Sequence, residues 1–351
     1  MEEIKVLVFD SKRYLVDSLS NVDHDGITFT HVETKLNKDN VSLAEGFNTI
    51  LVFVHDDINK EVLTKLKGYG ITSVFLRCTG YNNVDLKAAK KLGIKVYRVP
   101  AYSPNSIAEY TFALLLSLNR RIHKAYNRTK EYNFSLEDLV GSNLKGKTIG
   151  IIGLGKIGRI VAKIANGFGM RVIGYDSNKA IFSVLDDNVE YASLREIYER
   201  SDYITLHAPL TESTFHLINK DSLARMKKGV MIINTSRGTL IDSKALLDAI
   251  KSRKVSSVAL DVYEEEENIF YEDRSNHILD DEVLRDLIAM PNVIVTSHQA
   301  FLTKEALTNI ADTTTKNILD FFTNNITTEN ELCYGCGNVE NCKKDRKEKC
   351  F

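Results

Sequence analysis

The sequence has almost no net charge and no long apolar run. A formal charge of −1 over 351 residues gives no general attraction to nucleic acid or to a membrane surface. The start, MEEIKVLVFD, is acidic and continues as a strand pattern, which is unlike a secretory signal. No stretch reaches the length that crosses a bilayer. We therefore expect a cytoplasmic protein with a small-molecule substrate, and neither a nucleic acid nor a membrane as partner.

Cysteine is scarce outside one end of the chain. Cys78 is the one cysteine in the body of the chain, which fits a reducing compartment. Internal repeats and low-complexity linkers are also missing. A content of 43% hydrophobic and 26% charged residues is typical of globular proteins, and 351 residues are enough for two cores.

The centre of the chain carries the run TIGIIGLGKIG, whose glycines are Gly153, Gly155 and Gly158. The β-branched residues before it predict a buried strand, and residues 156–167 predict a helix with one apolar face. Glycines at this spacing permit a tight turn and let the backbone approach a pyrophosphate at the helix N-terminus. The pattern predicts a dinucleotide site. The alternative is a glycine turn in another kind of α/β domain.

Asp176 follows a second predicted strand, residues 171–175, about 20 residues beyond the glycines. A carboxylate there can accept both hydroxyls of the adenosine ribose and repels a 2′-phosphate. Ser177 and Asn178 offer no arginine to neutralise such a phosphate, although Lys179 is near. We therefore expect a strong preference for NAD over NADP.

Strand and helix patterns alternate on both sides of the glycine run. The segment before it has strand patterns at Ile4–Phe9, Ile27–Val32, Thr49–Val54, Ser73–Arg77 and Lys95–Val99, with helical patterns at Asn59–Lys67 and Leu86–Leu92. The segment after it has further strand patterns at Tyr203–His207, Val230–Thr235, Ser257–Val262 and Val293–Ser297. Alternation of this kind predicts an α/β protein with two doubly wound parallel sheets, of the Rossmann and flavodoxin kinds.

Two helical patterns connect the predicted domains. One begins after Pro104 and runs from Asn105 to about Tyr132, which we expect to be a single helix. The other, Lys304 to about Phe322, would return the chain to the first domain and leave a cleft between the two. The expected boundaries are residues 1–101 for the first part of the substrate domain, 102–300 for the NAD-binding domain, 301–332 for the return, and 333–351 for a cysteine-rich tail.

Three polar residues follow predicted strands of the second domain: Arg237, Glu266 and His298. Open α/β sheets build their sites at these carboxyl ends. A guanidinium can hold a substrate carboxylate with two parallel hydrogen bonds. An imidazolium can give a proton to a carbonyl oxygen, and a carboxylate beside it keeps the ring oriented and charged. Taken singly, Arg237 also fits a surface cation, Glu266 a solvated acidic run and His298 a packed histidine. Together the three residues predict hydride transfer to a 2-keto acid.

Several motifs in order carry a family resemblance over residues 1–332: LRCTGYNNVDL, VPAYSPNSIAEY, GIIGLGKIG, LHAPLT, NTSRGTLID, ALDVYEEEENIF and TSHQAFLT. With them the chain resembles the D-isomer-specific 2-hydroxyacid dehydrogenases, and within that family the fermentative NAD-dependent D-lactate dehydrogenases of bacteria. Many relatives have Pro before the catalytic histidine, whereas this chain has Ser297. The D stereochemistry follows from the resemblance alone.

The resemblance implies roles for individual residues. Arg237 would bind and polarise the substrate, Glu266 would support the histidine, and His298 would be the proton donor. The cofactor contacts would be Gly153, Gly155, Lys156, Ile157, Gly158, Asp176, Ala208, Pro209, Thr214, Thr235, Ser236 and Asp261. The substrate contacts would be Thr79, Gly80, Tyr102 and Phe301. Members of the family usually form homodimers, and some form homotetramers.

The function that follows is reduction of pyruvate to D-lactate with NADH. Three alternatives stay open: the same chemistry on a bulkier 2-keto acid such as phenylpyruvate or 2-oxoisocaproate, a non-catalytic NAD-sensing protein, and a dehydrogenase regulated through its tail. Pocket volume decides between pyruvate and a bulkier keto acid, and the sequence does not give that volume.

The tail beyond Leu332 is not required by the family fold. It holds Cys333, Cys336, Cys342 and Cys350 in the pattern C-x2-C-x5-C-x7-C. Four thiolates suit zinc or iron. A polar tail with reduced thiols, or a redox-sensitive disulfide, fits the same residues.

Overall fold

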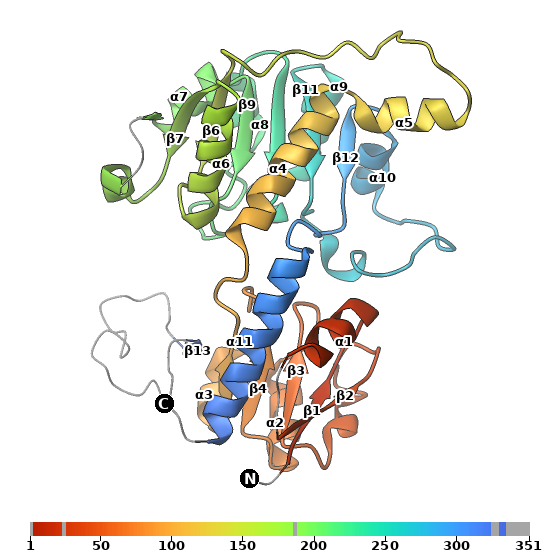
Figure 1. The fold of residues 1–351 in the computed structure, drawn as a ribbon, viewed down its shortest axis with the longest axis vertical. Helices are drawn as coiled ribbons and strands as arrows, with labels where there is room; N and C mark the ends of the chain where they lie inside the picture. Colours follow the sequence, from red (N-terminus) through yellow and green to blue (C-terminus); the bar gives the residue numbers. More distant parts are fainter. Residues whose placement is uncertain (1–2, 23–25, 185–187, 324–329, 335–351) are drawn as a thin grey trace. The chain divides into compact units, whose positions relative to one another are not determined.

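The computed structural model describes residues 3–22, 26–184, 188–323 and 330–334. The chain divides into two compact units. Unit 1 comprises Met1–Ser103 together with the chain from Thr303 onward, and unit 2 comprises Pro104–Leu302. Each unit is built around one sheet (Figure 1).

The sheet of unit 1 has the strand order β13-β5-β4-β3-β1-β2. Its neighbours pair in parallel, except that β13 runs antiparallel to β5. The strands are β1 (Ile4–Val8), β2 (Ile27–His31), β3 (Thr49–Val52), β4 (Ser73–Leu76), β5 (Lys95–Tyr97) and β13 (Glu331–Leu332). The order of the first five, 2-1-3-4-5, is that of a flavodoxin-like sheet.

Helices cover the sheet of unit 1 because its strands are apolar on both faces. They are α1 (Arg13–Ser20), α2 (Lys60–Gly68), α3 (Leu86–Leu92) and α11 (Lys304–Phe322), with a short 3₁₀ turn η1 (Val41–Ala44). Helix α11 contacts α1 and β4. Its Phe321 meets the stacked rings of Phe75 and Tyr97 edge-on, so the chain that returns at Thr303 completes the core of this unit.

The sheet of unit 2 has the order β12-β11-β10-β9-β6-β7-β8, with parallel pairing throughout. The strands are β6 (Thr148–Ile152), β7 (Arg171–Tyr175), β8 (Val189–Tyr191), β9 (Tyr203–Leu206), β10 (Val230–Asn234), β11 (Val255–Leu260) and β12 (Val293–Val295). In chain order this is 3-2-1-4-5-6 with a seventh strand added. The direction of winding reverses between β6 and β9, which is where such sheets bind ligands.

Helices lie on both faces of this sheet (Figure 1), and a hydrophobic cluster fills the space on each face. Helices α4 (Pro104–Asn119) and α6 (Lys156–Gly167) pack on one face. The other face carries α7 (Leu194–Arg200), α8 (Lys220–Arg225), α9 (Ser243–Lys251) and α10 (Glu282–Ala289). Side chains alternate between the faces along each strand, as Tyr203 and Ile204 do in β9. The remaining 3₁₀ turns are η2 (Lys179–Val184), η3 (Gly238–Leu240) and η4 (Glu266–Asn268).

The predicted fold class is confirmed, and the expected single helix from Asn105 to about Tyr132 is wrong. Helix α4 ends at Asn119, and a separate helix α5 (Ile122–Lys130) follows. Between them Arg121 adopts a φ of 54°, which no helix residue can hold. The end of α4 is held by the segment after α5, because the Asn119 amide donates to the carbonyl of Ser142 at 2.6 Å. Among the described residues, no helix has both the length and the apolarity that a membrane crossing needs.

The imidazole of His207 lies directly after β9. Its Nε2 is 2.8 Å from Thr205 Oγ1, and its Nδ1 is buried without a hydrogen-bond partner in the described part of the chain. Burial lowers the pKa of His207 to about 3. The ring is therefore neutral in the folded chain at neutral pH, whereas in an unfolded chain it titrates near 6.5.

Between pH 6.5 and pH 3 the unfolded chain binds a proton that folded His207 does not. The contribution of the neutral His207 ring to the free energy of unfolding is therefore fully present above pH 6.5 and declines as the pH falls below that value. From pH 6.5 to pH 5, we expect the free energy of unfolding to drop by about 2 kcal/mol more in the wild type than in His207→Asn. Urea unfolding at both pH values measures this. Exposed His277→Asn is the matched control, and an equal pH dependence in wild type and His207→Asn contradicts the prediction.

Candidate active site

The glycine turn lies at the carboxyl end of β6. Gly153 has a φ of 95°, and its N–H donates to the carbonyl of Tyr175 at 2.8 Å. A Cβ on Gly153 would lie 2.6 Å from backbone atoms of His207 and Ala208, and one on Gly158 would lie 2.0 Å from the carbonyl oxygen of Gly153. Both positions therefore need glycine. A Cβ on Gly155 would meet nothing within 4 Å, so the turn is open on the side where a pyrophosphate would bind.

The start of α6 provides the donors for such an anion. Gly155 is the N-cap residue, and no side chain caps the helix. The first N–H groups, which begin at Lys156 and Ile157, therefore lack an intrahelical partner and carry the positive end of the helix dipole. Asp176 lies beside this turn, since its Oδ2 accepts from Leu154 N at 2.8 Å. Turn, helix start and carboxylate thus fit the pyrophosphate and ribose of a dinucleotide.

The segments that follow β9 and β10 are tied together next to this turn. His207 N donates to the carbonyl of Ile152 at 2.7 Å. Ser236 Oγ donates to the carbonyl of Ala208 at 2.7 Å. The other predicted cofactor residues are held by their neighbours in the same way: Thr214 Oγ1 donates to Pro209 O at 2.7 Å, and Thr235 Oγ1 lies 3.0 Å from Thr111 Oγ1 of α4. Their contacts with a cofactor stay predictions.

Glu266 and His298 form a direct pair. His298 Nδ1 lies 2.8 Å from Glu266 Oε1, and the two side chains are 23% and 19% exposed. The other oxygen, Glu266 Oε2, accepts from Tyr263 N at 2.8 Å, which fixes the carboxylate. An ionised carboxylate can only accept, so Nδ1 is the protonated nitrogen and Nε2 is left for another partner.

Asp261 holds the loop that presents His298. The carboxylate is completely buried and accepts from Thr296 Oγ1 at 2.6 Å, Gln299 N at 2.9 Å and Ala300 N at 2.9 Å. Its own carbonyl accepts from His298 N at 2.7 Å. Burial raises the pKa of Asp261, and these hydrogen bonds act against that rise.

The loop needs this support because His298 has a φ of 54°, a conformation that costs an L-residue roughly 1–2 kcal/mol. Tyr271, which sequence reasoning missed, adds to it: its hydroxyl donates to the carbonyl of His298 at 3.0 Å. No spacing or motif signals that contact. The predicted contact of Asp261 with nicotinamide stays a prediction.

Arg237 is placed by a close approach of two backbones. A Cβ on the next residue, Gly238, would lie 2.0 Å from the carbonyl of Tyr263, so only glycine fits. Tyr263, whose N–H donates to the Glu266 carboxylate, therefore lies against the turn that carries Arg237. Asn234 Nδ2 donates to Arg237 O at 2.8 Å, and Arg237 Nη1 donates to Ser236 O at 2.7 Å. The structure thus connects the Arg237 turn to the segment of Glu266 and His298 within unit 2.

The predicted substrate residues are divided between the units. Thr79, Gly80 and Tyr102 belong to unit 1, and Phe301 lies near the end of unit 2. Thr79 Oγ1 donates to Val99 O at 2.9 Å, and Arg98 Nη1 donates to Thr79 O at 2.9 Å. Thr79, in the turn after β4, is therefore held through both its side chain and its carbonyl. The roles of these residues toward substrate stay predictions.

The cysteine tail lies almost wholly outside the described residues. Cys336, Cys342 and Cys350 are in that part, and Cys333 is in the short described stretch after β13. In the described ranges no group of three or more His, Cys, Asp or Glu side chains could hold a metal ion. Zinc or iron binding by the tail stays a prediction.

Comparisons with known proteins agree with this geometry. Residues 112–300 match the family model of the D-isomer-specific 2-hydroxyacid dehydrogenase NAD-binding domain. The chain is 46% identical over 316 residues to the D-lactate dehydrogenase of Escherichia coli, which covers 90% of this chain and 96% of that protein. The apo-structure of D-lactate dehydrogenase from Escherichia coli matches with a TM-score of 0.85 at 43% identity, over 94% of this chain and all 100% of that one.

A D-lactate dehydrogenase from Lactobacillus jensenii, whose structure holds NAD⁺, matches with a TM-score of 0.78 at 29% identity, over 94% of this chain and 100% of that one. An NAD-binding family model and an NAD-bound neighbour accord with the open glycine turn and with Asp176 beside it. The chain belongs to the D-isomer-specific 2-hydroxyacid dehydrogenases and is an NAD-dependent oxidoreductase.

Proposed function

We propose that this enzyme reduces pyruvate to D-lactate with NADH. The observation that carries the proposal is the Glu266–His298 pair, at 2.8 Å, on a loop fixed by buried Asp261. The similarity to proteins named D-lactate dehydrogenase supports the choice of substrate. When bound, the nicotinamide supplies the hydride for the substrate carbonyl carbon.

His298 is the proton donor in this proposal. The carbonyl oxygen becomes a hydroxyl, and the proton comes from Nε2, the nitrogen that faces away from Glu266. The Glu266 carboxylate accepts from Nδ1 and so orients the ring, and the protonated ring is the form that can donate. In the reverse direction the neutral ring takes the proton back.

Arg237 binds the substrate carboxylate. A guanidinium has five N–H donors in a planar fork, and one of its nitrogens is engaged by Ser236 O. The remaining donors can form the two parallel bonds that orient a carboxylate. Asp176 selects NADH over NADPH through the ribose hydroxyls.

Steady-state kinetics over a panel of 2-keto acids test the substrate. We expect pyruvate to give the highest kcat/KM and a D-configured product, and NADPH to give a much lower kcat/KM than NADH. A preference for phenylpyruvate or 2-oxoisocaproate contradicts the choice of pyruvate and retains the mechanism. Tight NADH binding without turnover of any keto acid points instead to an NAD-sensing protein.

Substitution of His298 tests the mechanism. His298→Asn removes the proton donor, so kcat falls by about 10²- to 10⁴-fold while the Kd for NADH is nearly unchanged. Arg237→Lys raises KM and also lowers kcat, because an ammonium is a point charge that cannot replace a fork.

A second histidine–carboxylate pair in unit 2 gives the matched control. His216 Nε2 lies 2.5 Å from Glu264 Oε1. His216→Asn breaks that pair and leaves His298 in place, so kcat stays close to that of the wild type. A loss of kcat as large as that of His298→Asn would place the proton donor elsewhere.

The proposed enzyme is a homo-oligomer. Large apolar side chains are exposed on α5 and on the segment after it, with Tyr132 at 85%, Phe134 at 71%, Leu136 at 80% and Val140 at 87%. Helix α5 itself buries no residue. An apolar run of this kind marks an association surface, and a second copy of the chain would cover it.

Sedimentation measures the oligomer. We expect the triple variant Tyr132→Ser/Phe134→Ser/Leu136→Ser to have a smaller mass in solution than the wild type. The substitutions remove the apolar side chains that would contact the second copy of the chain. Ile278→Ser, at a position that is also 87% exposed, is the control and keeps the wild-type mass. An unchanged mass in the triple variant excludes this segment as the interface.

A further inference from the structure

The side chain of Arg98 connects two segments of unit 1. Arg98 directly follows β5, and its Nη1 donates to the carbonyl of Thr79 at 2.9 Å, in the turn after β4. The central carbon of the guanidinium also lies 5.1 Å from the centroid of the Tyr81 ring, in the same turn. A hydrogen bond on one side of Gly80 and a cation–π contact on the other therefore hold the guanidinium against this turn.

The carbonyl of Thr79 belongs to the same peptide group as the N–H of Gly80. The peptide bond is trans, so the group is planar and its N–H points opposite to its C=O. A hydrogen bond that fixes the carbonyl therefore also fixes the direction of the N–H. In the part of the chain that the structure describes, no acceptor bonds the Gly80 N–H, whereas the Gly80 carbonyl accepts from Cys78 Sγ at 3.3 Å.

The guanidinium also strengthens the Gly80 N–H as a donor. Hydrogen bonds in a chain polarise one another, and a bond from a charged donor is stronger than one between neutral groups. A cation at the Thr79 oxygen draws electron density away from the peptide nitrogen, so the N–H of Gly80 carries more positive charge. A negatively charged acceptor gains most from such a donor, and a carboxylate is an acceptor of this kind.

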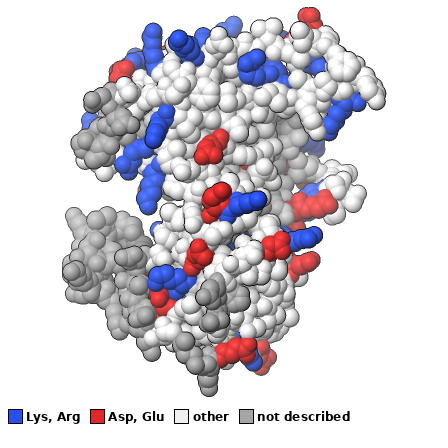
Figure 2. Space-filling view, viewed as in Figure 1, with Lys and Arg blue, Asp and Glu red and all other residues white. Residues whose placement is uncertain are grey.

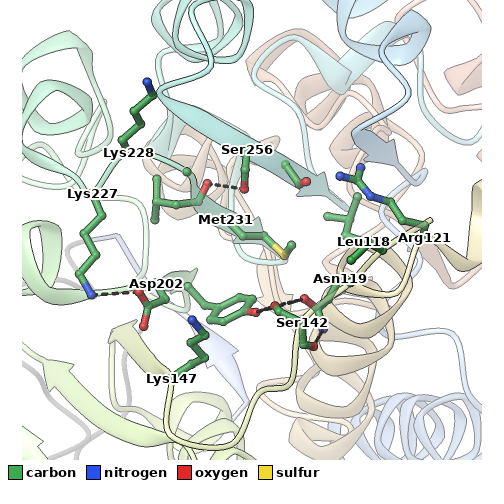
Figure 3. A pocket seen from close by; sticks show the side chains of 16 residues that line it. Leu118, Asn119, Arg121, Ser142, Lys147, Asp202, Lys227, Lys228, Met231 and Ser256 are labelled. Carbon is green, nitrogen blue, oxygen red and sulfur yellow. Dashed lines mark hydrogen bonds and ion pairs between the residues drawn. The ribbon is translucent and has the colours of Figure 1, made fainter. Parts of the chain in front are cut away.

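Among the residues that the structure describes, no carboxylate balances the charge of Arg98. On the face drawn in Figure 2, by contrast, Lys and Arg side chains of unit 1 lie close to Asp or Glu. In unit 2, Lys227 pairs with Asp202 at 2.9 Å, as the dashed line in Figure 3 shows. The charge of Arg98 is therefore available to stabilise a negative group that binds at the turn.

The backbone of Arg98 is fixed within unit 1. Asn317 of α11 is 3% exposed, and its Nδ2 donates to the carbonyl of Arg98 at 3.1 Å. The N–H of Arg98 donates to the carbonyl of Asn330 at 3.0 Å. Asn330 Nδ2 in turn donates to Asn317 Oδ1 at 2.8 Å. The guanidinium thus projects from a built framework, so the turn needs little further ordering when an anion binds.

We propose that Arg98 is a positioning residue for the substrate carboxylate, because it directs and polarises the Gly80 N–H that binds this group. The proposal rests on the proposed function, in which the substrate is a 2-keto acid, and on the predicted contact of Gly80 with it. A carboxylate offers roughly four acceptor sites, so it can bond this N–H in addition to a guanidinium fork. Arg98 itself acts through the peptide group and does not touch the substrate.

The peptide group of Thr79 and Gly80 can be observed alone by NMR, because Thr-Gly occurs once in the sequence. The full chain, labelled with ¹³C-carbonyl threonine and ¹⁵N-glycine, gives a single coupled signal. Arg98→Met keeps an unbranched stem and removes the donors and the charge, so we expect the Gly80 amide proton to move upfield. The other glycine signals should stay in place, which shows that the variant is folded.

Oxamate, a non-reacting isostere of pyruvate, tests the bound anion. Added to the wild type with NADH, it should move the Gly80 proton downfield. Its Kd should be about tenfold higher in Arg98→Met.

Steady-state kinetics separate positioning from a general structural role. The carboxylate is bound alike before and during hydride transfer, so Arg98→Met should raise the KM for pyruvate about tenfold and leave kcat within twofold of the wild type. The Kd for NADH should not change, because the glycine turn belongs to unit 2. Lys91→Met, which removes an exposed cation near the end of α3, is the matched control and should keep the wild-type KM.

Three results would each overturn the proposal: a Gly80 proton that does not move in Arg98→Met, a KM that rises equally in Lys91→Met, or a kcat that falls as far as kcat/KM. A wild type that does not reduce pyruvate contradicts the proposed function instead. The oxamate titration then still decides whether Arg98 controls the binding of a carboxylate at Gly80.

Discussion

The buried carboxylate of Asp261 is the interaction on which the proposed chemistry depends. It has 0% exposure, and burying an ion is costly unless its oxygens are satisfied by donors. Three donors from residues 296–300 meet this need. The same bonds hold His298 in a left-handed backbone conformation that it would not adopt alone. One set of hydrogen bonds thus offsets both the burial of the Asp261 carboxylate and the backbone strain at His298.

Glycines set the remaining geometry by letting backbones approach. Gly238 brings the end of β10 against Tyr263, and Gly153 brings the end of β6 against His207. In both places a methyl group would lie within 2.6 Å of backbone atoms. The carboxyl ends of neighbouring strands are therefore closer than side chains would permit, and polar groups from separate parts of the chain come together at this edge of the sheet.

Many of the strands and helix boundaries could be predicted from the sequence because they depend on local residue patterns. Apolar runs predicted the strands other than β8 and β13 to within about two residues, and Pro104 marked the start of α4. The break after Asn119 was not readable, since the apolar period continues through it and the cause is a contact with Ser142. The hydrogen bond from Tyr271 to His298 was not predicted for the same reason, because it joins residues far apart in the chain.

A histidine beside a carboxylate is not by itself a proton donor, as a comparison of His298 with two other imidazoles of unit 2 illustrates. His298 and His216 both pair with a glutamate, and their side chains are similarly exposed, at 23% and 31%. They differ in the nitrogen that is used. His298 bonds through Nδ1, next to its own backbone, so the outer nitrogen Nε2 is available to a substrate. His216 bonds Glu264 through Nε2, and His207 bonds Thr205 through Nε2. In both the outer nitrogen is already occupied, so of these three rings only His298 has its outer nitrogen available for the proposed proton transfer while a carboxylate orients the ring.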